Sequence, residues 1–144
     1  MATLFKFSEA ASLALHAMVL VAAHDGEVIK ARELAAAFRA SDAHMSKVCQ
    51  RLTRAGLLRA RRGVAGGVLL ARGAGRIRLL EIYQAIEGPV KLSPCLFRDR
   101  QCRSHRKHDC VFGKRIMSYE SDFLGYLQKT TLSAVAKTTD LRLR

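Results

Sequence analysis

The chain has 144 residues, of which 25 are Lys or Arg and 12 are Asp or Glu, so its formal net charge is +13. Such a charge indicates a polyanionic partner, either nucleic acid or an anionic membrane surface. The hydrophobic fraction of 49% is typical of a folded protein and excludes a disordered basic tail. The length predicts one domain with room for an appended element.

The first apolar run, residues 10–23, is too short to span a bilayer. With Lys6 ahead of it the run faintly resembles a signal peptide, whereas Glu9 and a stop at Asp25-Gly26 favour a buried helix capped by Ser8. We therefore expect a cytoplasmic protein without membrane partners, whose cysteines stay reduced.

The next two predicted helices have the spacing of a helix-turn-helix. The first covers residues 31–38, and the second is capped by Ser41 and ends at Ala55-Gly56. On the second helix Cys49 shares the apolar face, so we interpret it as a core residue and not as a ligand. The opposite face is basic, which is typical of a solvated helix surface and also of a recognition helix in the major groove. Its candidate DNA-binding residues are His44, Lys47, Arg51 and Arg54.

A basic hairpin is predicted to follow, with strands at 57–62 and 68–71 and a glycine-rich tip at 63–67. A hairpin in this place is typical of the wing of a winged helix. The glycines can simply form the turn, or they can let the tip approach a phosphate backbone or minor groove closely. The candidate DNA contacts in the hairpin are Arg59, Arg61, Arg62, Gly66 and Gly67. Between Asp42 and Glu81 the chain has nine Lys or Arg residues and no acid.

The remaining helices are predicted at 79–86 and, after Cys110, over about fifteen residues. The last helix carries an apolar stripe, and beyond a closed domain it has only a second subunit to pack on, so we expect a homodimer. The predicted division is a DNA-binding domain at 1–90, a cysteine-rich loop at 91–112, and a dimerisation helix with a C-terminal tail at 113–144. The stripe consists of Phe112, Ile116, Tyr119, Phe123, Tyr126 and Leu127.

Three of the four cysteines lie in one polar, basic segment: Cys95, Cys102 and Cys110. Nearby cations favour the thiolate, which is the form that binds metals. The C-x6-C-x7-C spacing is too wide for a zinc knuckle and suits an iron-sulfur cluster with a fourth ligand from elsewhere. A structural zinc that uses His105 or His108, a redox disulfide, and three cysteines without a ligand remain as alternatives.

An enzyme is the weakest hypothesis. No Ser-His-Asp set, paired carboxylates or phosphate-binding loop accompanies the cysteines, and an electron carrier has no use for an acid-free basic stretch. We therefore expect a DNA-binding protein without catalytic activity.

Several segments follow one another in a specific order and spacing: residues 7–9, 13–15, 44–47, 52–57, 61–71, 86–89, the three loop cysteines and 131–135. Taken together, over residues 4–136, they resemble the Rrf2 family of bacterial transcription regulators. The resemblance implies a mainly α winged helix-turn-helix with a small β-wing and a long C-terminal dimerisation helix. It also implies a homodimer that binds a palindromic promoter operator in double-stranded DNA. In the family's cluster sensors, the three cysteines hold a [2Fe-2S] or [4Fe-4S] cluster that responds to redox state, nitric oxide or iron supply.

The sequence departs from the family pattern in the cysteine segment. Its spacings exceed the usual five-residue gaps, His105 and His108 precede the third cysteine, and Gly113 stands where a histidine ligand would follow it. The fourth ligand therefore stays open between these two histidines and Glu9. The Phe7-Ser8-Glu9 context resembles relatives in which a carboxylate from the partner subunit is the ligand, so Glu9 joins the three cysteines as the candidate metal-binding set.

Overall fold

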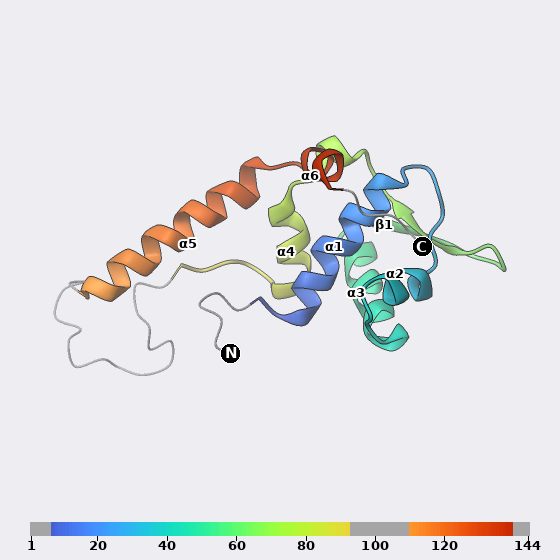
Figure 1. Ribbon diagram of the computed structural model, residues 1–144, viewed down its shortest axis with the longest axis horizontal. Coiled ribbons are helices and arrows are strands. Elements are labelled where there is room, and N and C mark those ends of the chain that lie inside the picture. The colour runs from blue at the N-terminus through green and yellow to red at the C-terminus, as the bar shows by residue number, and fades with distance from the viewer. Residues whose placement is uncertain (1–6, 93–109, 140–144) are drawn as a thin grey trace.

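The computed structural model describes residues 7–92 and 110–139 as a mainly helical protein with one small hairpin (Figure 1). The described elements, in chain order, are α1 (Glu9–Ala23), α2 (Ala31–Ala37), α3 (Asp42–Arg54), β1 (Leu58–Arg61), β2 (Gly67–Leu70), η1 (Ala74–Arg76), α4 (Leu79–Glu87), α5 (Val111–Lys129) and α6 (Leu132–Thr138). The predicted fold class, a winged helix-turn-helix, is confirmed.

Helix α1 lies at the centre of the core. The Ser8 hydroxyl accepts the backbone N–H of Ala11 at 3.0 Å, so the predicted cap is present. Apolar side chains on several sides of α1 are buried, because the helix packs against α3, α4 and α6. The chain then turns at Gly26, whose φ of +88° is one that residues with a side chain rarely adopt. Among the described residues, no helix is long and apolar enough to cross a membrane.

Helices α2 and α3 form the predicted helix-turn-helix. The Ser41 hydroxyl accepts the backbone N–H of His44 at 3.2 Å, and α3 ends before Gly56, where φ is +72°. The apolar face of α3 is buried, including Cys49, as predicted. Burial raises the pKa of the Cys49 thiol to about 11, so this thiol stays protonated and inert at neutral pH.

The hairpin pairs β1 with β2 in an antiparallel register in which Leu58 faces Leu70 and Arg61 faces Gly67. A third segment joins its edge. The N–H of Ile29 donates to the carbonyl of Val68 at 2.9 Å, and the N–H of Val68 donates back at 2.8 Å. Ile29 thus forms a single bridge with Val68, which fastens the loop after α1 to the hairpin.

The C-terminal region contains more structure than the sequence patterns predicted. Helix α5 has 19 residues and projects away from the body of the molecule, and α6 returns to lie over α1 (Figure 1). Leu132 is fully buried, and its N–H donates to the carbonyl of Ile77 at 2.8 Å. Residues 132–138, expected only as a tail, therefore pack against the same body as the helix-turn-helix.

Candidate nucleic-acid interface and cysteine segment

The outward face of α3 is basic and polar. Lys47 and Arg54 are exposed and have no hydrogen-bond or ion-pair partner within the described part of the chain. Gln50 lies between them at i+3 from Lys47 and is also exposed, although the charge pattern of the helix did not predict it. A glutamine here adds a side chain that can form two hydrogen bonds with one adenine. Its position on the same helix face as Lys47 and Arg54 could have predicted Gln50 as a candidate contact.

Two other predicted members of this face have partners inside the chain. His44 is half-buried, and its Nδ1 lies 3.9 Å from Oε1 of Glu9, at the start of α1. Arg51 is exposed, and its Nη1 donates to the carbonyl of Ile86 at 3.2 Å, in the last turn of α4. A guanidinium has further N–H donors, so this bond leaves Arg51 able to bind a second acceptor.

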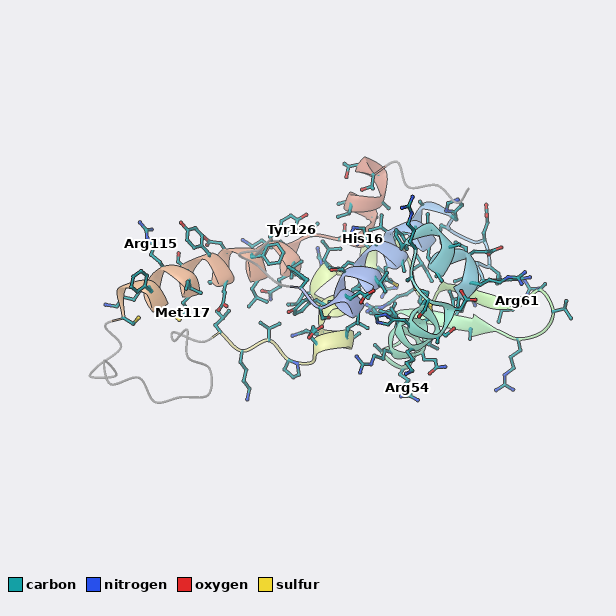
Figure 2. All side chains as sticks on the ribbon, turned by 60° about the horizontal axis from the view of Figure 1, so that its bottom comes forward. His16, Arg54, Arg61, Arg115, Met117 and Tyr126 are labelled. Atoms are coloured by element: carbon teal, nitrogen blue, oxygen red, sulfur yellow. The ribbon has the colours of Figure 1, made fainter. Side chains whose placement is uncertain are left out.

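The hairpin carries its arginines on exposed positions. Arg59, Arg61 and Arg62 are all exposed, and Val64 at the tip is 100% exposed. Figure 2 shows Arg54 extending from α3 and Arg61 on the hairpin beside it. Helix α3 also packs against β1, so the helix with the basic face and the strand that carries Arg59 and Arg61 are neighbours.

The structure gives an intramolecular reason for the two glycines of the wing. A Cβ on Gly66 would lie 2.6 Å from the carbonyl oxygen of Arg61, and a Cβ on Gly67 would lie 2.4 Å from that of Ile29. Both distances are below van der Waals contact with backbone atoms. The close approach that excludes side chains here is therefore between segments of the same chain.

Only the third loop cysteine is among the described residues. Cys110 caps α5, and its Sγ accepts the backbone N–H of Gly113 at 3.4 Å. Cys95, Cys102, His105 and His108 lie outside the described residues. Across 7–92 and 110–139, no three His, Cys, Asp or Glu side chains gather as a metal site.

Glu9, the candidate fourth ligand, begins α1 and its side chain is 75% exposed. Within one chain the first turn of α1 and the first turn of α5 lie well apart (Figure 1). One chain therefore does not bring Glu9 next to Cys110.

The apolar stripe of α5 is largely exposed. Phe112 is 71% exposed, Tyr119 57% and Tyr126 52%, whereas Leu127 is buried against the body. Phe123 is partly covered, because its ring contacts that of Phe7 with 5.7 Å between centroids.

Known proteins share both this sequence pattern and this fold. Residues 7–138 match the Rrf2 family, described as iron-dependent transcriptional regulators. The chain belongs to the Rrf2 family. Among solved structures, B. subtilis CymR, described as the global cysteine regulator, is 25% identical with a TM-score of 0.72, covering 95% of this chain and 100% of that one. The oxidized form of Staphylococcus aureus CymR is 24% identical with a TM-score of 0.75, covering 94% and 99%. T. potens IscR is 20% identical with a TM-score of 0.71, covering 97% and 93%.

Membership of the Rrf2 family confirms the resemblance drawn from the sequence segments. It also makes the protein a DNA-binding transcription regulator and confirms the expectation that it is not an enzyme. The basic faces of α3 and the hairpin are the natural candidates for the DNA contacts of such a regulator.

Proposed function

We propose that this Rrf2 family member is a homodimeric, cytoplasmic regulator that binds a palindromic promoter operator and senses redox state, nitric oxide or iron supply through an iron-sulfur cluster. The observation that carries the DNA-binding half of the proposal is the exposed basic face of α3 beside a basic hairpin, since Lys47 and Arg54 on that face have no partner among the described residues. The observation that carries the sensing half is the set of three thiols in one polar segment.

Helix α3 is proposed to enter the major groove. Lys47, Gln50 and Arg54 would face the bases or the nearest phosphates, because they project from the side of α3 opposite its buried face. Arg51 would reach the DNA with its free N–H groups while it keeps its bond to α4. His44 stands at the first turn of α3, and we retain it as a candidate contact with phosphate.

The hairpin is proposed to act as the wing. Arg59, Arg61 and Arg62 supply positive charge along it, and such residues position a protein on the phosphate backbone without reading sequence. Gly66 and Gly67 contribute by keeping the hairpin in shape, and Gly66 lies in the tip that would approach the DNA.

The cluster is proposed to be held by Cys95, Cys102 and Cys110. The donor set suits it, because three thiolates from a long loop can converge on a cluster, and Gly113 offers an N–H to the Cys110 sulfur. A bound [2Fe-2S] or [4Fe-4S] cluster would supply a group that oxidants or nitric oxide can alter. The chain's own contribution is to fix one ligand at the first turn of α5.

Glu9 is proposed as the fourth ligand because of its Phe7-Ser8-Glu9 context. The ligand would come from the partner subunit, because α1 and α5 of one chain begin far apart. A ligand from the partner would tie the state of the cluster to α3 through the contact between Glu9 and His44. The test compares Glu9→Ala with His105→Ala and His108→Ala by absorption spectrum and by the rate of cluster loss in air. A spectrum and rate changed only by a histidine variant would assign the ligand to that histidine.

The dimer is proposed to form through α5. An exposed aromatic stripe on a helix that projects from the body is suited to an isologous interface with a second copy. Such an interface would hold two α3 helices about 34–36 Å apart, which is the spacing of half-sites on one DNA face. The three-part division of the chain follows from this proposal, with α6 assigned to the DNA-binding body.

A structural zinc or a thiol-disulfide switch in the same fold is the second candidate. The similarity to the oxidized form of Staphylococcus aureus CymR favours a thiol switch, because that regulator has been crystallised in an oxidized state. Treatment of metal-free protein with peroxide, followed by mapping of any disulfide among the three loop cysteines, would detect it.

The proposed function is tested by selection of DNA from a random pool under anaerobic conditions, followed by measurement of the dissociation constant before and after air exposure. We expect enrichment of a palindromic sequence and a change in affinity when the bound group is lost. A failure to enrich any sequence would contradict the DNA-binding proposal, and an unchanged affinity would contradict the sensing proposal.

A further inference from the structure

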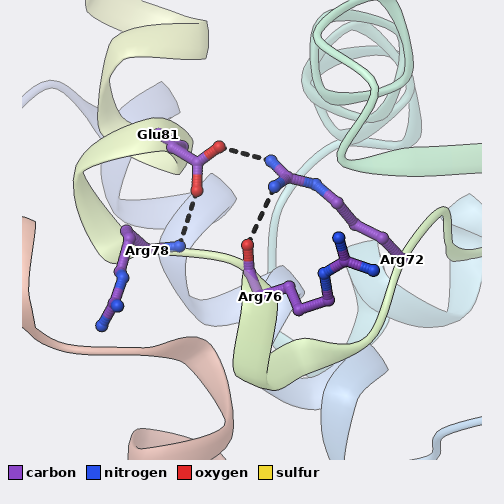
Figure 3. Close-up of polar contacts among 4 residues, drawn as sticks. All are labelled: Arg72, Arg76, Arg78 and Glu81. Carbon is purple, nitrogen blue, oxygen red and sulfur yellow. Dashed lines mark hydrogen bonds and ion pairs between the residues drawn. The ribbon is translucent and has the colours of Figure 1, made fainter.

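The base of the hairpin is tied to α4 by one arginine and one glutamate (Figure 3). Arg72 lies two residues beyond β2. Its Nη1 donates to the carbonyl of Arg76 at 2.8 Å, and its Nη2 donates to Oε1 of Glu81. The other carboxylate oxygen of Glu81 accepts the backbone N–H of Arg78 at 2.8 Å. One carboxylate thus holds both the segment that leaves the hairpin and the first turn of α4.

The same cluster reaches the end of α5. Nη1 of Arg78 donates to the carbonyl of Lys129, the last residue of α5, at 2.7 Å. The next residue pairs as well, because the N–H of Leu79 donates to the carbonyl of Thr130 at 3.1 Å. The exit of the hairpin, the start of α4 and the end of α5 therefore meet at one place.

Glu81 is ionised in this setting. Partial burial alone would raise the pKa of its carboxyl, but the hydrogen bond from the Arg78 backbone and the Arg72 guanidinium outweigh that effect and lower the pKa. Its negative charge also neutralises Arg72, the first cation after the hairpin. By Coulomb's law alone, an anionic side chain beside a basic surface weakens the binding of a polyanion.

We propose that Arg72, Glu81 and Arg78 form a positioning unit, which sets the orientation of the hairpin relative to α5 and so places the hairpin arginines on DNA. The inference rests on the proposed function, in which the hairpin is the wing and α5 joins the two subunits. None of the three side chains contacts DNA in this arrangement. Each acts through the backbone that it holds.

Glu81→Gln separates positioning from charge, because the two effects have opposite signs. Loss of a negative charge alone should tighten DNA binding, whereas loss of the anchor should weaken it. We expect Glu81→Gln to bind about two- to fivefold more weakly, in line with the strength of a half-exposed ion pair. The matched control is Asp25→Asn, which removes one exposed negative charge that has no partner among the described residues.

Arg72→Lys supplies a second test. It preserves the charge, but an ammonium group cannot reproduce the forked donation to Arg76 and Glu81. We expect weaker binding with an unchanged dependence on salt, because Arg72 touches no phosphate. A phosphate contact would instead lower the salt slope by about one when Arg72→Ala is measured, and that result would overturn the proposal.

Hydrogen exchange of the hairpin amides, residues 58–70, gives a readout that needs no DNA. We expect faster exchange in Glu81→Gln and Arg72→Lys at a temperature where both are folded, and unchanged exchange in Asp25→Asn. If the wild-type protein binds no DNA, the proposed function is wrong, but the exchange test still shows whether Arg72 and Glu81 hold the hairpin. Glu81→Gln protein with wild-type exchange, or with equal or tighter DNA binding, would overturn the positioning unit.

Discussion

Gly67→Ala should loosen the attachment of the hairpin to the loop after α1. The new Cβ would stand 2.4 Å from the Ile29 carbonyl oxygen and 2.8 Å from its carbonyl carbon, so the two backbones must separate. The same carbonyl accepts the N–H of Val68, and the Ile29 N–H donates to the Val68 carbonyl. Both hydrogen bonds lie in a buried setting, because Ile29 is 1% exposed and Val68 7%.

The expected cost follows from these contacts. Weakening two buried backbone hydrogen bonds costs about 1–3 kcal/mol in total, and the reduced freedom of the unfolded chain returns about 0.4–1 kcal/mol. The overpacking is relieved by the separation of the two backbones and is not counted again, so a net loss of about 0.5–2.5 kcal/mol is expected. For a chain of this size, the midpoint of thermal unfolding should fall by about 2–8 °C.

The assay is thermal unfolding followed by circular dichroism, with Gly73→Ala as the matched control. Gly73 has φ of −55° and no atom within 4 Å of a Cβ, so the control should unfold at or slightly above the wild-type temperature. Equal midpoints for Gly67→Ala and Gly73→Ala would refute the steric argument. If Gly67→Ala kept the wild-type midpoint and lost DNA binding, the glycine would be needed by the DNA and not by the fold.

Three further outcomes are expected. Arg51→Ala should weaken operator binding by about 1–3 kcal/mol if the side chain reads a base, or lower the salt slope by about one if it touches phosphate. Titrations at several salt concentrations distinguish these two roles, and wild-type affinity would remove Arg51 from the interface. Tyr119→Asp should give a monomer by sedimentation, with Ser118→Asp as the off-stripe control, and a dimer that survives would remove α5 as the interface. Glu81 has a lowered pKa in the folded state, so its contribution to stability is present above its unfolded value of about 4.3 and is lost as the pH falls through the lower folded value. The difference in unfolding temperature between wild type and Glu81→Gln should therefore shrink with acidification below about pH 4, and a constant difference would contradict the ion pair.

The sequence predicted most elements of the DNA-binding body because their signals are local. Ser8 and Ser41 mark helix starts, Gly56 and Gly88 mark helix ends, and the buried positions of α3 recur at helical spacing. The hairpin was equally visible, since glycines separate its two short strands. These local signals do not show which helices and strands pack against one another in the folded protein.

Helix α6 was not predicted, because its signals are not local. It has seven residues, too few to be stable alone, and depends on contacts with α1 and on the pairing of Leu132 with Ile77. The Thr131 cap was available as a signal but carries little weight without that packing. Helix α5 runs beyond the expected fifteen residues, because nothing stops it before Thr130.

The candidate interface was predictable only as a list of side chains on one face. The helix pattern placed Lys47, Arg51 and Arg54 correctly on the exposed side of α3. It could not show that Arg51 also bonds to α4, that His44 lies near Glu9, or that Arg72 is engaged by Glu81. These contacts join residues far apart in the sequence, so they follow from tertiary structure and not from spacing.

If the three loop cysteines hold an iron-sulfur cluster, the iron and sulfide content of the protein must depend on these thiols. Wild-type protein and Cys110→Ser are purified without oxygen and analysed for iron, acid-labile sulfide and zinc, together with the visible absorption spectrum. We expect a brown wild-type protein that contains iron and sulfide in matching amounts, and a Cys110→Ser protein that has lost most of both. A colourless wild-type protein that contains zinc, or no metal, would contradict the cluster and leave the zinc or thiol-switch regulator in its place.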